Sequence, residues 1–235
     1  MNIKIRKCPF KIKNEFYNYE NLLNDEVLLK EGFYYLIFQY DGNSSLKNFK
    51  TEILKSSEYI EFISSKNQTI KLNSGTAVLL SKEILNKDLS KNHYHFGSLK
   101  KDAYFVNKPW GYEYWITGEN PINELVLKFI HIKKGTKTSL QVHQEKFESN
   151  FLVEGEAILS YSKESFTIKK DYIIDKIQIN EKSVIDVSPL GIHQLESISD
   201  IYLLESSTNH LDDVIRLIDD SGRGDGKIES EHQNS

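Results

Sequence analysis

The stretch that decides the fold is Gly135-Thr-Lys-Thr-Ser-Leu-Gln141-Val-His143-Gln-Glu-Lys146-Phe-Glu148, which Gly155 closes. A second short stretch, Pro189-Leu-Gly191-Ile-His193, follows later in the same half of the chain. The residues around both stretches read as strands, with the glycines at the breaks between them. Residues two apart on a strand point to the same face, so Gln141 and His143 project together.

These two stretches predict a metal site. Glu148 begins the apolar run after a short polar break, and His193 comes from a distant strand that could close over the other groups. We therefore expect Gln141, His143, Glu148 and His193 to converge. One amide oxygen, two imidazoles and one carboxylate form a mixed shell suited to Zn²⁺, with Mn²⁺, Fe²⁺, Ni²⁺ or Co²⁺ as alternatives.

Four segments in order carry a resemblance to a known family. The segment from Gly135 to Gly155 resembles the first cupin motif, and Pro189–His193 resembles the second. With Gln141 in the first ligand position, the chain looks like the cupin domain of type II mannose-6-phosphate isomerases, which is also fused to GDP-mannose pyrophosphorylases. Lys108-Pro-Trp-Gly111-Tyr-Glu113 is similar to the entry of that domain, and the run from Leu211 to Arg223 is similar to its acidic and basic exit.

The resemblance implies an all-β fold, a cupin double-stranded β-helix or jelly-roll barrel, in the carboxy-terminal half. We expect this metal-binding cupin domain to cover residues 106–223. Residues 1–105 are also strand-like and predict a degenerate cupin-like half without the metal set, so that the whole chain is bicupin-like. The Gly-, Ser- and charge-rich residues 224–235 predict a disordered tail.

Local patterns predict some elements of the first half. The aromatic run Phe33–Tyr40 reads as a strand, and Asp41-Gly42-Asn43 predicts a turn that ends it. Asn73-Ser-Gly75 predicts another turn between strands. The segments 14–29 and 81–89 each predict a short helix.

Composition excludes several classes of protein. The 235 residues have a formal net charge of −4, 39% of them are hydrophobic, and Cys8 is the single cysteine. A nucleic-acid partner is not expected, because such proteins usually carry a basic face. No intramolecular disulfide is possible, and neither a signal peptide nor a membrane-length apolar run is visible. These features predict a soluble cytoplasmic protein without a membrane partner.

Charged residues near the motifs predict the substrate contacts. Lys146 either holds a phosphate or an oxyanion, or is a solvated turn lysine. We expect Arg223 to contact substrate, with an ion pair to Asp219 or Asp220 as the alternative, and Arg216 to be structural. Glu205 ends an apolar strand, so it either pairs with a cation or faces the cavity as an acid or base.

Five further residues lie in or near the motifs. His131 and His210 are predicted to be structural, with His131 facing away from Ile130 and Ile132 and pointing inward. Trp110 is predicted to anchor the core, with sugar stacking as the alternative. Gln194 and Ser221 depart from the family, which usually has Arg and Tyr there, and both changes affect the substrate side of the resemblance.

The resemblance implies a metal-dependent isomerase of a phosphorylated sugar that serves nucleotide-sugar or surface-polysaccharide synthesis. The candidates for its acid or base are Glu205, Glu113 and Lys146, while Arg223 and Lys146 would anchor the phosphate. One alternative is a non-catalytic cupin that binds a sugar or sugar nucleotide. Another is a different cupin enzyme, such as an epimerase or an Fe²⁺ oxygenase. The expected partner is a small sugar phosphate, and a homodimer is the expected assembly.

Overall fold

The computed structural model describes residues 2–23, 25–47, 49, 53–84, 93–116, 124–168 and 171–232. The chain forms two compact units. Unit 1 consists of Met1–Cys8, Tyr104–Thr117 and Glu124–Ser235, and unit 2 consists of Pro9–Ala103 and Gly118–Asn123. Both are built almost entirely of strands. No helix in the described ranges is long and apolar enough to span a membrane.

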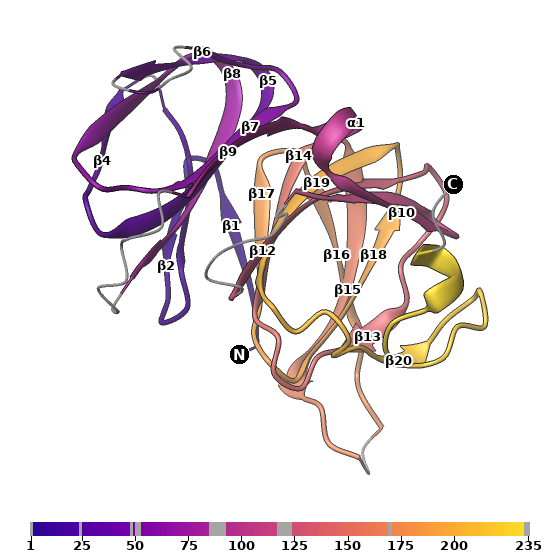
Figure 1. The fold of residues 1–235 in the computed structure, drawn as a ribbon. Coiled ribbons are helices and arrows are strands. Elements are labelled where there is room, and N and C mark those ends of the chain that lie inside the picture. Colours follow the sequence, from indigo (N-terminus) through magenta and orange to yellow (C-terminus); the bar gives the residue numbers. More distant parts are fainter. Residues whose placement is uncertain are drawn as a thin grey trace. The chain divides into compact units, whose positions relative to one another are not determined.

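Unit 1 is made of two antiparallel sheets (Figure 1). Its strands are β1 (Ile3–Lys7), β10 (Tyr104–Lys108), β11 (Gly111–Trp115), β12 (Leu125–Ile132), β13 (Leu140–Val142), β14 (Glu148–Glu154), β15 (Glu156–Ser165), β16 (Asp175–Asn180), β17 (Ser183–Val187), β18 (Gly191–Ser197), β19 (Ile201–Thr208) and β20 (Ile215–Ile218). The seven-stranded sheet has the order β1-β17-β14-β19-β12-β11-β10, and the five-stranded sheet has the order β16-β15-β18-β13-β20.

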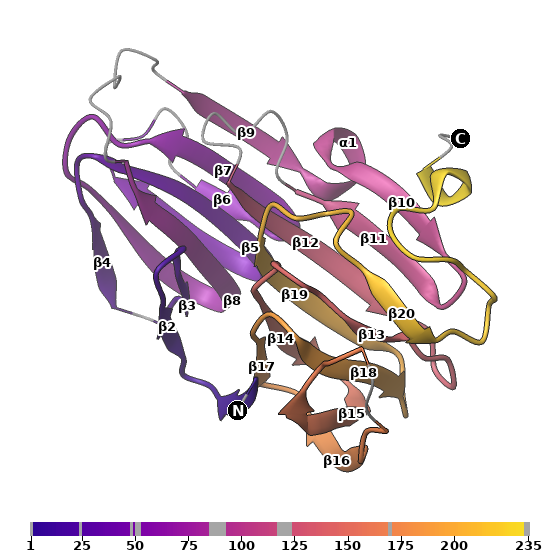
Figure 2. The ribbon, with the colours of Figure 1, turned by 90° about the horizontal axis from the view of Figure 1, so that it is seen from below.

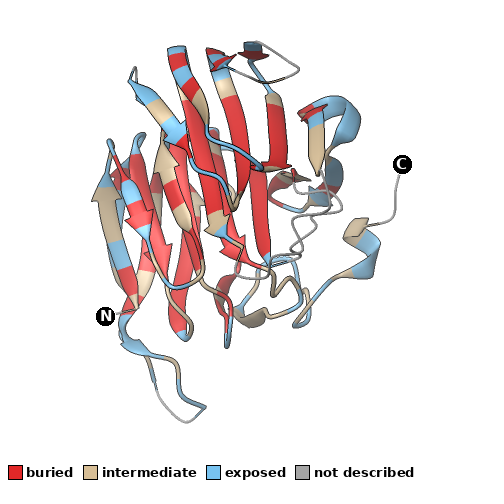
Figure 3. Ribbon diagram, turned by 60° about the vertical axis from the view of Figure 1, so that its left-hand side comes forward, coloured by how far each residue is buried: buried red, intermediate tan, exposed pale blue. Residues whose placement is uncertain are grey.

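The core of unit 1 is built from residues that alternate along these strands. Ile130 and Ile132 of β12 and Leu203 of β19 join Leu159 and Leu195 of the other sheet in one buried cluster. Each fully buried aliphatic side chain contributes about 1.5–3 kcal/mol. Figure 3 shows buried residues along most strands and exposed residues at strand ends and loops. This two-sheet sandwich confirms the predicted all-β class.

The first strand of the chain belongs to unit 1, which differs from the predicted division at residue 105. β1 pairs with β17, with Ile3 opposite Val187 and Ile5 opposite Ile185. Ile3 is 2% exposed and belongs to the core of unit 1. Burial of the apolar side of this strand explains why Met1–Cys8 does not belong to the unit that follows it.

Unit 2 is one further antiparallel sheet. Its elements are β2 (Lys11–Lys13), β3 (Asn18–Asn21), β4 (Glu26–Leu29), β5 (Phe33–Lys47), β6 (Ile53–Lys55), β7 (Glu58–Ile63), β8 (Gln68–Glu83), β9 (Tyr94–Ser98) and the one-turn helix α1 (Leu99–Asp102). The order is β2-β3-β8-β5-β7-β9, with β4 paired to β8 and β6 paired to β5. Tyr35, Ile37, Ile60, Phe62 and Leu79 form part of its core.

The two turns predicted at Gly42 and Gly75 are wrong, because both glycines lie inside long strands. β5 and β8 pair along their length, and Gly42 lies opposite Gly75. Their φ angles are 72° and 79°, and a Cβ on either glycine would come within 2.2 Å of a backbone oxygen of the opposite strand. Glycine therefore allows the paired strands to bend here without ending.

The helix predicted over residues 14–29 is also wrong, since this segment contains β3 and β4. Tyr17 and Tyr19 are both buried, a spacing of two that belongs to a strand. Of the helix predicted over residues 81–89, Ser81–Glu83 form the end of β8. Residues 85–89 lie outside the described part of the chain.

The tail predicted to be disordered is ordered as far as His232. The 3₁₀ helix η1 (Glu229–His232) lies against β10. The Lys108 Nζ atom donates to Glu231 Oε2 at 2.7 Å, and the Tyr104 hydroxyl donates to the carbonyl of His232 at 3.1 Å. These contacts give the charged tail residues partners that composition did not reveal. Residues 233–235 are not among those described.

Candidate metal centre

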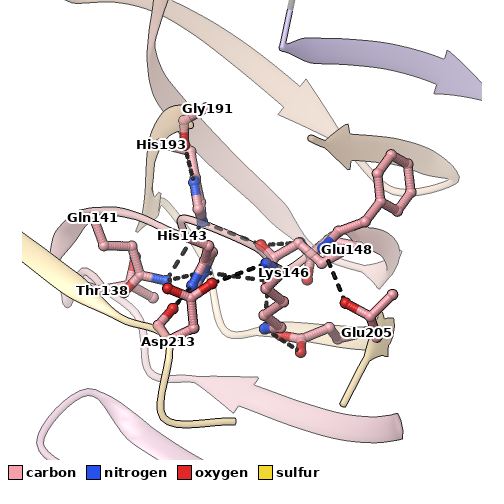
Figure 4. A network of polar contacts seen from close by, with 12 residues as sticks. Thr138, Gln141, His143, Lys146, Glu148, Gly191, His193, Glu205 and Asp213 are labelled. Atoms are coloured by element: carbon pink, nitrogen blue, oxygen red, sulfur yellow. Dashed lines mark hydrogen bonds and ion pairs between the residues drawn. The ribbon is translucent and has the colours of Figure 1, made fainter. Parts of the chain in front are cut away.

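Two histidines direct their Nε2 atoms into the same space (Figure 4). His143 directly follows β13, and His193 lies on β18 as the register partner of Gln141. His143 Nδ1 is hydrogen-bonded to the carbonyl of Asp213, and His193 Nδ1 to the carbonyl of Gly191 at 3.0 Å. Since a carbonyl only accepts, each Nδ1 carries the proton, and each Nε2 keeps a lone pair for a ligand.

Glu148, the first residue of β14, lies close to the imidazole rings of both His143 and His193. Its Oε1 lies 3.1 Å from Nε2 of His193, and its Oε2 lies 3.5 Å from Nε2 of His143. Ligand atoms from the three residues all lie within 4.8 Å of one another. Such separations suit an ion with bonds of about 2.0–2.2 Å. The structure therefore brings together three of the four predicted ligands, and their donor atoms fit a divalent metal.

Gln141 lies beside these three residues with its amide nitrogen turned toward the rings, which differs from the expected oxygen ligand. Its Nε2 is 3.4 Å from Nε2 of His143 and 3.4 Å from Nε2 of His193, while its Oε1 accepts from the Ser139 hydroxyl at 2.7 Å. Turning the amide by half a rotation exchanges oxygen and nitrogen. Ser139 can then accept from Nε2, because a hydroxyl both donates and accepts.

Lys146 is an internal ion-pair partner and not the solvated or phosphate-holding lysine that was predicted. Its Nζ donates to Glu148 Oε2 at 2.6 Å and to Glu205 Oε1 at 2.8 Å (Figure 4). Burial by itself lowers the pKa of Lys146, but the two carboxylates outweigh burial and raise the pKa above its usual value. Conversely, burial raises the pKa of Glu148, but Lys146 and the two histidines hold it well below its usual value. Lys146 therefore keeps Glu148 ionised.

The neutral form of His143 is favoured at physiological pH. Burial, followed by the charge of Lys146, lowers the pKa of His143 to about 4. A neutral imidazole is the form that binds metal, so the environment prepares this ring for an ion.

The ion pairs continue away from the centre along the seven-stranded sheet. Lys128 of β12 lies 3.7 Å from Glu205 and 3.6 Å from Glu113, and its Nζ is 4.7 Å from the Trp115 ring centroid. The indole of Trp115 donates to Glu113 at 2.7 Å. Burial raises the pKa of Glu113, but Lys128, Lys108 and this hydrogen bond lower it to about 2.

Lys108 extends these ion pairs from Glu113 to Glu231, and Glu231 in turn pairs with Arg223. The guanidinium of Arg223 is therefore not the free substrate contact that was predicted. Its Nη2 donates to Asp219 Oδ2 at 2.6 Å, its Nε donates to the same oxygen at 3.1 Å, and its Nη1 donates to Glu231 at 3.2 Å. The alternative prediction, an ion pair with Asp219, is therefore the arrangement that the structure has.

The centre borders a cavity of about 110 Å³. That volume is several times what one ordered water needs, so the space can admit a small ligand beside an ion. Its lining includes the four predicted metal ligands, Lys128, Glu205 and Arg216. Buried and charged side chains therefore line the same cavity.

Other predicted residues lie where the strand pattern places them. Trp110 is in the core and also lines the cavity. The His131 ring lies between Tyr112 and Tyr202, with both ring centroids 4.8 Å away, on the face opposite Ile130 and Ile132. Because Ile130 and Ile132 line the cavity, His131 points away from it, so the prediction that this ring points inward is wrong. His210 pairs with Glu145 and is part of no cluster of metal ligands among the described residues.

The two residues that differ from the resembled isomerase motifs, Gln194 and Ser221, do not line the cavity. Gln194 alternates with His193 on β18, and its Nε2 donates to the carbonyl of Thr138 at 2.8 Å. Ser221 is exposed, and its amide donates to Asp219 Oδ1 at 2.9 Å. Neither residue is part of the cavity lining.

Sequence reasoning gave no role to Asp213 or Lys128. The Asp213 carboxylate accepts the backbone amides of residues 144–146 at 2.7–2.9 Å, and its carbonyl accepts from His143, so this residue fixes the loop that carries the ligands. The feature of the sequence that could have indicated this role of Asp213 is its place in the acidic segment that begins at Leu211. The signal for Lys128 was a lysine inside the apolar strand 125–132, a position where a charge needs a buried partner.

No protein-family model matches the chain, and no curated protein matches it. Among solved structures, oxalate decarboxylase from Lactobacillus farciminis in a formate complex is similar, with 12% identity, a TM-score of 0.58 and coverage of 91% of this chain and 88% of that chain. Protein Ylba from E. coli is 10% identical, with a TM-score of 0.62 and coverage of 89% and 92%. HEPD from Streptomyces albus, with 2-hydroxyethylphosphonate and Fe(II) bound, is 6% identical, with a TM-score of 0.58 and coverage of 88% and 76%.

The fold and these neighbours define the class: an all-β chain with the cupin fold, whose solved neighbours are cupin proteins and include metal enzymes. The candidate centre of His143, Glu148 and His193 fits that class. The finer resemblance to type II mannose-6-phosphate isomerases depends on the sequence motifs alone.

Proposed function

We propose that the chain is a metal-dependent aldose–ketose isomerase of a phosphorylated sugar. The observation that carries this proposal is the convergence of His143, Glu148 and His193, with Gln141 beside them, on a cavity that Glu205 also lines. The four sequence motifs supply the substrate class. A solved neighbour with Fe(II) bound supports a divalent ion in this fold.

The residues would divide the chemistry of isomerisation between them. Gln141, His143, Glu148 and His193 would hold the ion, which as a Lewis acid lowers the cost of negative charge on the sugar oxygens. The reaction also needs a group that moves a proton between C1 and C2. The burial of His143, Glu148 and His193 would limit the water around the ion.

Of the three candidate acid or base residues, we select Glu205 for proton transfer, because the pKa values of the other two make them unsuitable as bases. The raised pKa of Lys146 keeps it protonated, so it cannot accept a proton. The pKa of Glu113, about 2, makes that carboxylate a weak base. Glu205 lines the same cavity and is held by Lys146 at 2.8 Å. We therefore assign proton transfer to Glu205 and the positioning of Glu148 and Glu205 to Lys146.

The direct test is a coupled assay against a panel of hexose, pentose and heptose phosphates, starting with the conversion of mannose 6-phosphate to fructose 6-phosphate. We expect turnover of at least one sugar phosphate, loss of turnover after treatment with a strong chelator, and recovery when a divalent metal is restored. Activity that survives complete metal removal would contradict the proposal.

The second candidate is a non-catalytic cupin that binds a sugar or sugar nucleotide. The observation that favours it is the engagement of Lys146 and Arg223 in ion pairs, which leaves fewer free groups for a substrate. A metal-loaded protein that binds sugar phosphates in a calorimeter but turns over none of the panel would support this candidate over the isomerase.

A further inference from the structure

A row of three side chains crosses the five-stranded sheet beside the metal centre. His193 on β18 is the register partner of Gln141 on β13, and Gln141 is also the register partner of Arg216 on β20. Figure 2 shows β20 beside β13. Register partners on adjacent antiparallel strands project from the same face, with Cβ atoms about 5 Å apart. Arg216 therefore starts from a position next to a predicted metal ligand.

The packing of its neighbours confirms which face Arg216 occupies. Ile215 and Leu217, on either side of it, pack against an apolar cluster that contains Leu140, Val142 and Ile192. Because side chains alternate along a strand, Arg216 lies on the opposite face, and it is part of the cavity lining.

The guanidinium of Arg216 is only partly satisfied. Its Nη1 donates to the carbonyls of Gly224 and Gly226, the latter at 2.9 Å. Its Nε is buried and has no hydrogen-bond partner within the described part of the chain. No described carboxylate lies within ion-pair distance of it, whereas Arg223 pairs with Asp219 and with Glu231.

A guanidinium beside a cavity, with no carboxylate in direct contact, favours an anion there. Burial, followed by the nearby charge of Arg223, lowers the pKa of Arg216 below its usual value, and the more distant carboxylates of Glu231, Asp219 and Asp225 oppose this shift only in part. An oxyanion in the cavity would supply the missing acceptor, and a guanidinium offers it several donors in one plane. Lys128 and Lys146 are less suited to this task, because carboxylates already surround their ammonium groups.

We infer that Arg216, and not Arg223, binds the anionic group of the substrate. That this group is the phosphate of a sugar phosphate depends on the proposed function; the role of Arg216 in binding an oxyanion does not. This assignment reverses the prediction from sequence, which gave Arg223 to substrate and Arg216 to structure.

The test is a calorimetric titration of the full chain with inorganic phosphate, both with its bound metal and after chelation, because phosphate can also bind a metal. We expect Arg216→Gln to weaken phosphate binding at least about tenfold in both forms, since hydrogen bonds to charged groups are worth about that much. Lys137→Gln is the matched control. It removes the same charge from a surface ion pair with Asp220 and should leave the affinity unchanged.

Arg216→Lys is a second variant, for use if Arg216→Gln does not fold. Lysine keeps the positive charge and can still donate a hydrogen bond to a carbonyl. Far-ultraviolet circular dichroism and metal content identify which variants are folded. We expect folded Arg216→Lys to bind phosphate several-fold more weakly than the unmodified chain. Phosphate affinity equal to that of the unmodified chain in a folded Arg216 variant, or no phosphate binding by the unmodified chain, overturns the inference.

The outcomes also separate this inference from the proposed function. Arg216-dependent phosphate binding without turnover of any sugar phosphate would retain the anion site and reject the isomerase. Turnover with an unchanged KM in folded Arg216→Gln would retain the isomerase and reject the role of Arg216.

Discussion

At the scale of single residues, the loss of His143 tests the metal centre most directly. His143→Ala removes one imidazole from a buried ligand set, so we predict that bound metal falls to about a tenth or less of its original content. The measurement is elemental analysis of protein purified without a histidine tag. His210→Ala is the control, because that ring is half-exposed and pairs with Glu145. Equal metal content in both variants would reject the centre.

Glu205→Gln tests the acid or base. The amide keeps the size of the side chain but cannot accept a proton from carbon, so we predict a loss of kcat of about 10²–10⁴-fold with bound metal retained. Steady-state kinetics and metal analysis are measured on the same sample, because Glu205 also pairs with Lys146. Glu145→Gln removes an exposed carboxylate and should leave kcat unchanged. An active Glu205→Gln variant would assign proton transfer to another group.

The convergence of the candidate metal ligands could be predicted from sequence because they lie in two short motifs. Gln141 and His143 share a face through the period of a strand, and Glu148 and His193 follow at motif spacings. The roles of Lys146 and Arg223 could not be predicted, since each depends on carboxylates whose positions only the folded sheets define. Glu205 is far from Lys146 in sequence, yet their charged atoms are 2.8 Å apart.

At the scale of elements, the bend shared by β5 and β8 requires its two glycines. Gly42→Ala places a Cβ within 2.2 Å of the carbonyl oxygen of Ser74 at a φ of 72°. We predict a loss of at least about 3 kcal/mol from the free energy of unfolding. Gly32→Ala is the matched control. Its φ is 82° but a Cβ there meets nothing within 4 Å, so it should cost only about 1 kcal/mol. Urea unfolding measures both, and equal losses would mean that the close approach is unimportant.

The β11 and β12 pair should contribute stability that depends on pH. The pKa of Glu113 is lowered from 4.5 to about 2 in the folded chain, so its ionised form favours folding. This contribution is fully present above pH 4.5 and is lost as the pH falls toward 2, and it amounts to about 3 kcal/mol.

Glu113→Gln should remove this dependence. We predict that the variant is less stable than the unmodified chain at pH 7 and that the difference shrinks as the pH is lowered from 4.5 to 3. Urea unfolding at a series of pH values measures the difference. A difference that stays constant over that range would show that the Glu113 charge is not responsible.

The strand at the aromatic run Phe33–Tyr40 could be predicted, but the end of that strand could not. Asp41-Gly42-Asn43 has the composition of a turn, and local sequence does not show that Gly42 will lie opposite Gly75 inside a longer pair of strands. The segment 14–29 failed as a helix for a related reason, because Asn18–Asn21 pair with β8, a strand far away in sequence, and Tyr17 and Tyr19 are buried.

At the scale of the whole molecule, metal binding should stabilise unit 1 selectively. All the candidate ligands belong to unit 1. A bound ion should therefore raise the free energy needed to open the strands that carry them. We predict slower hydrogen exchange in β13, β14 and β18 after metal is added, and little change in β5 and β8 of unit 2. Mass spectrometry of exchanged peptides measures this. Slower exchange confined to unit 2 would place the ion elsewhere.

The pairing of β1 with β17 has a consequence for how the protein is made. Ile3–Lys7 leave the ribosome before their partner Ser183–Val187, which emerges only after the whole of unit 2 has been synthesised. Ile3–Lys7 therefore lack this partner while unit 2 is being made. The edge of the sheet that carries Glu148 therefore closes late, and until then a nascent chain exposes a strand that chaperones or neighbouring chains can bind.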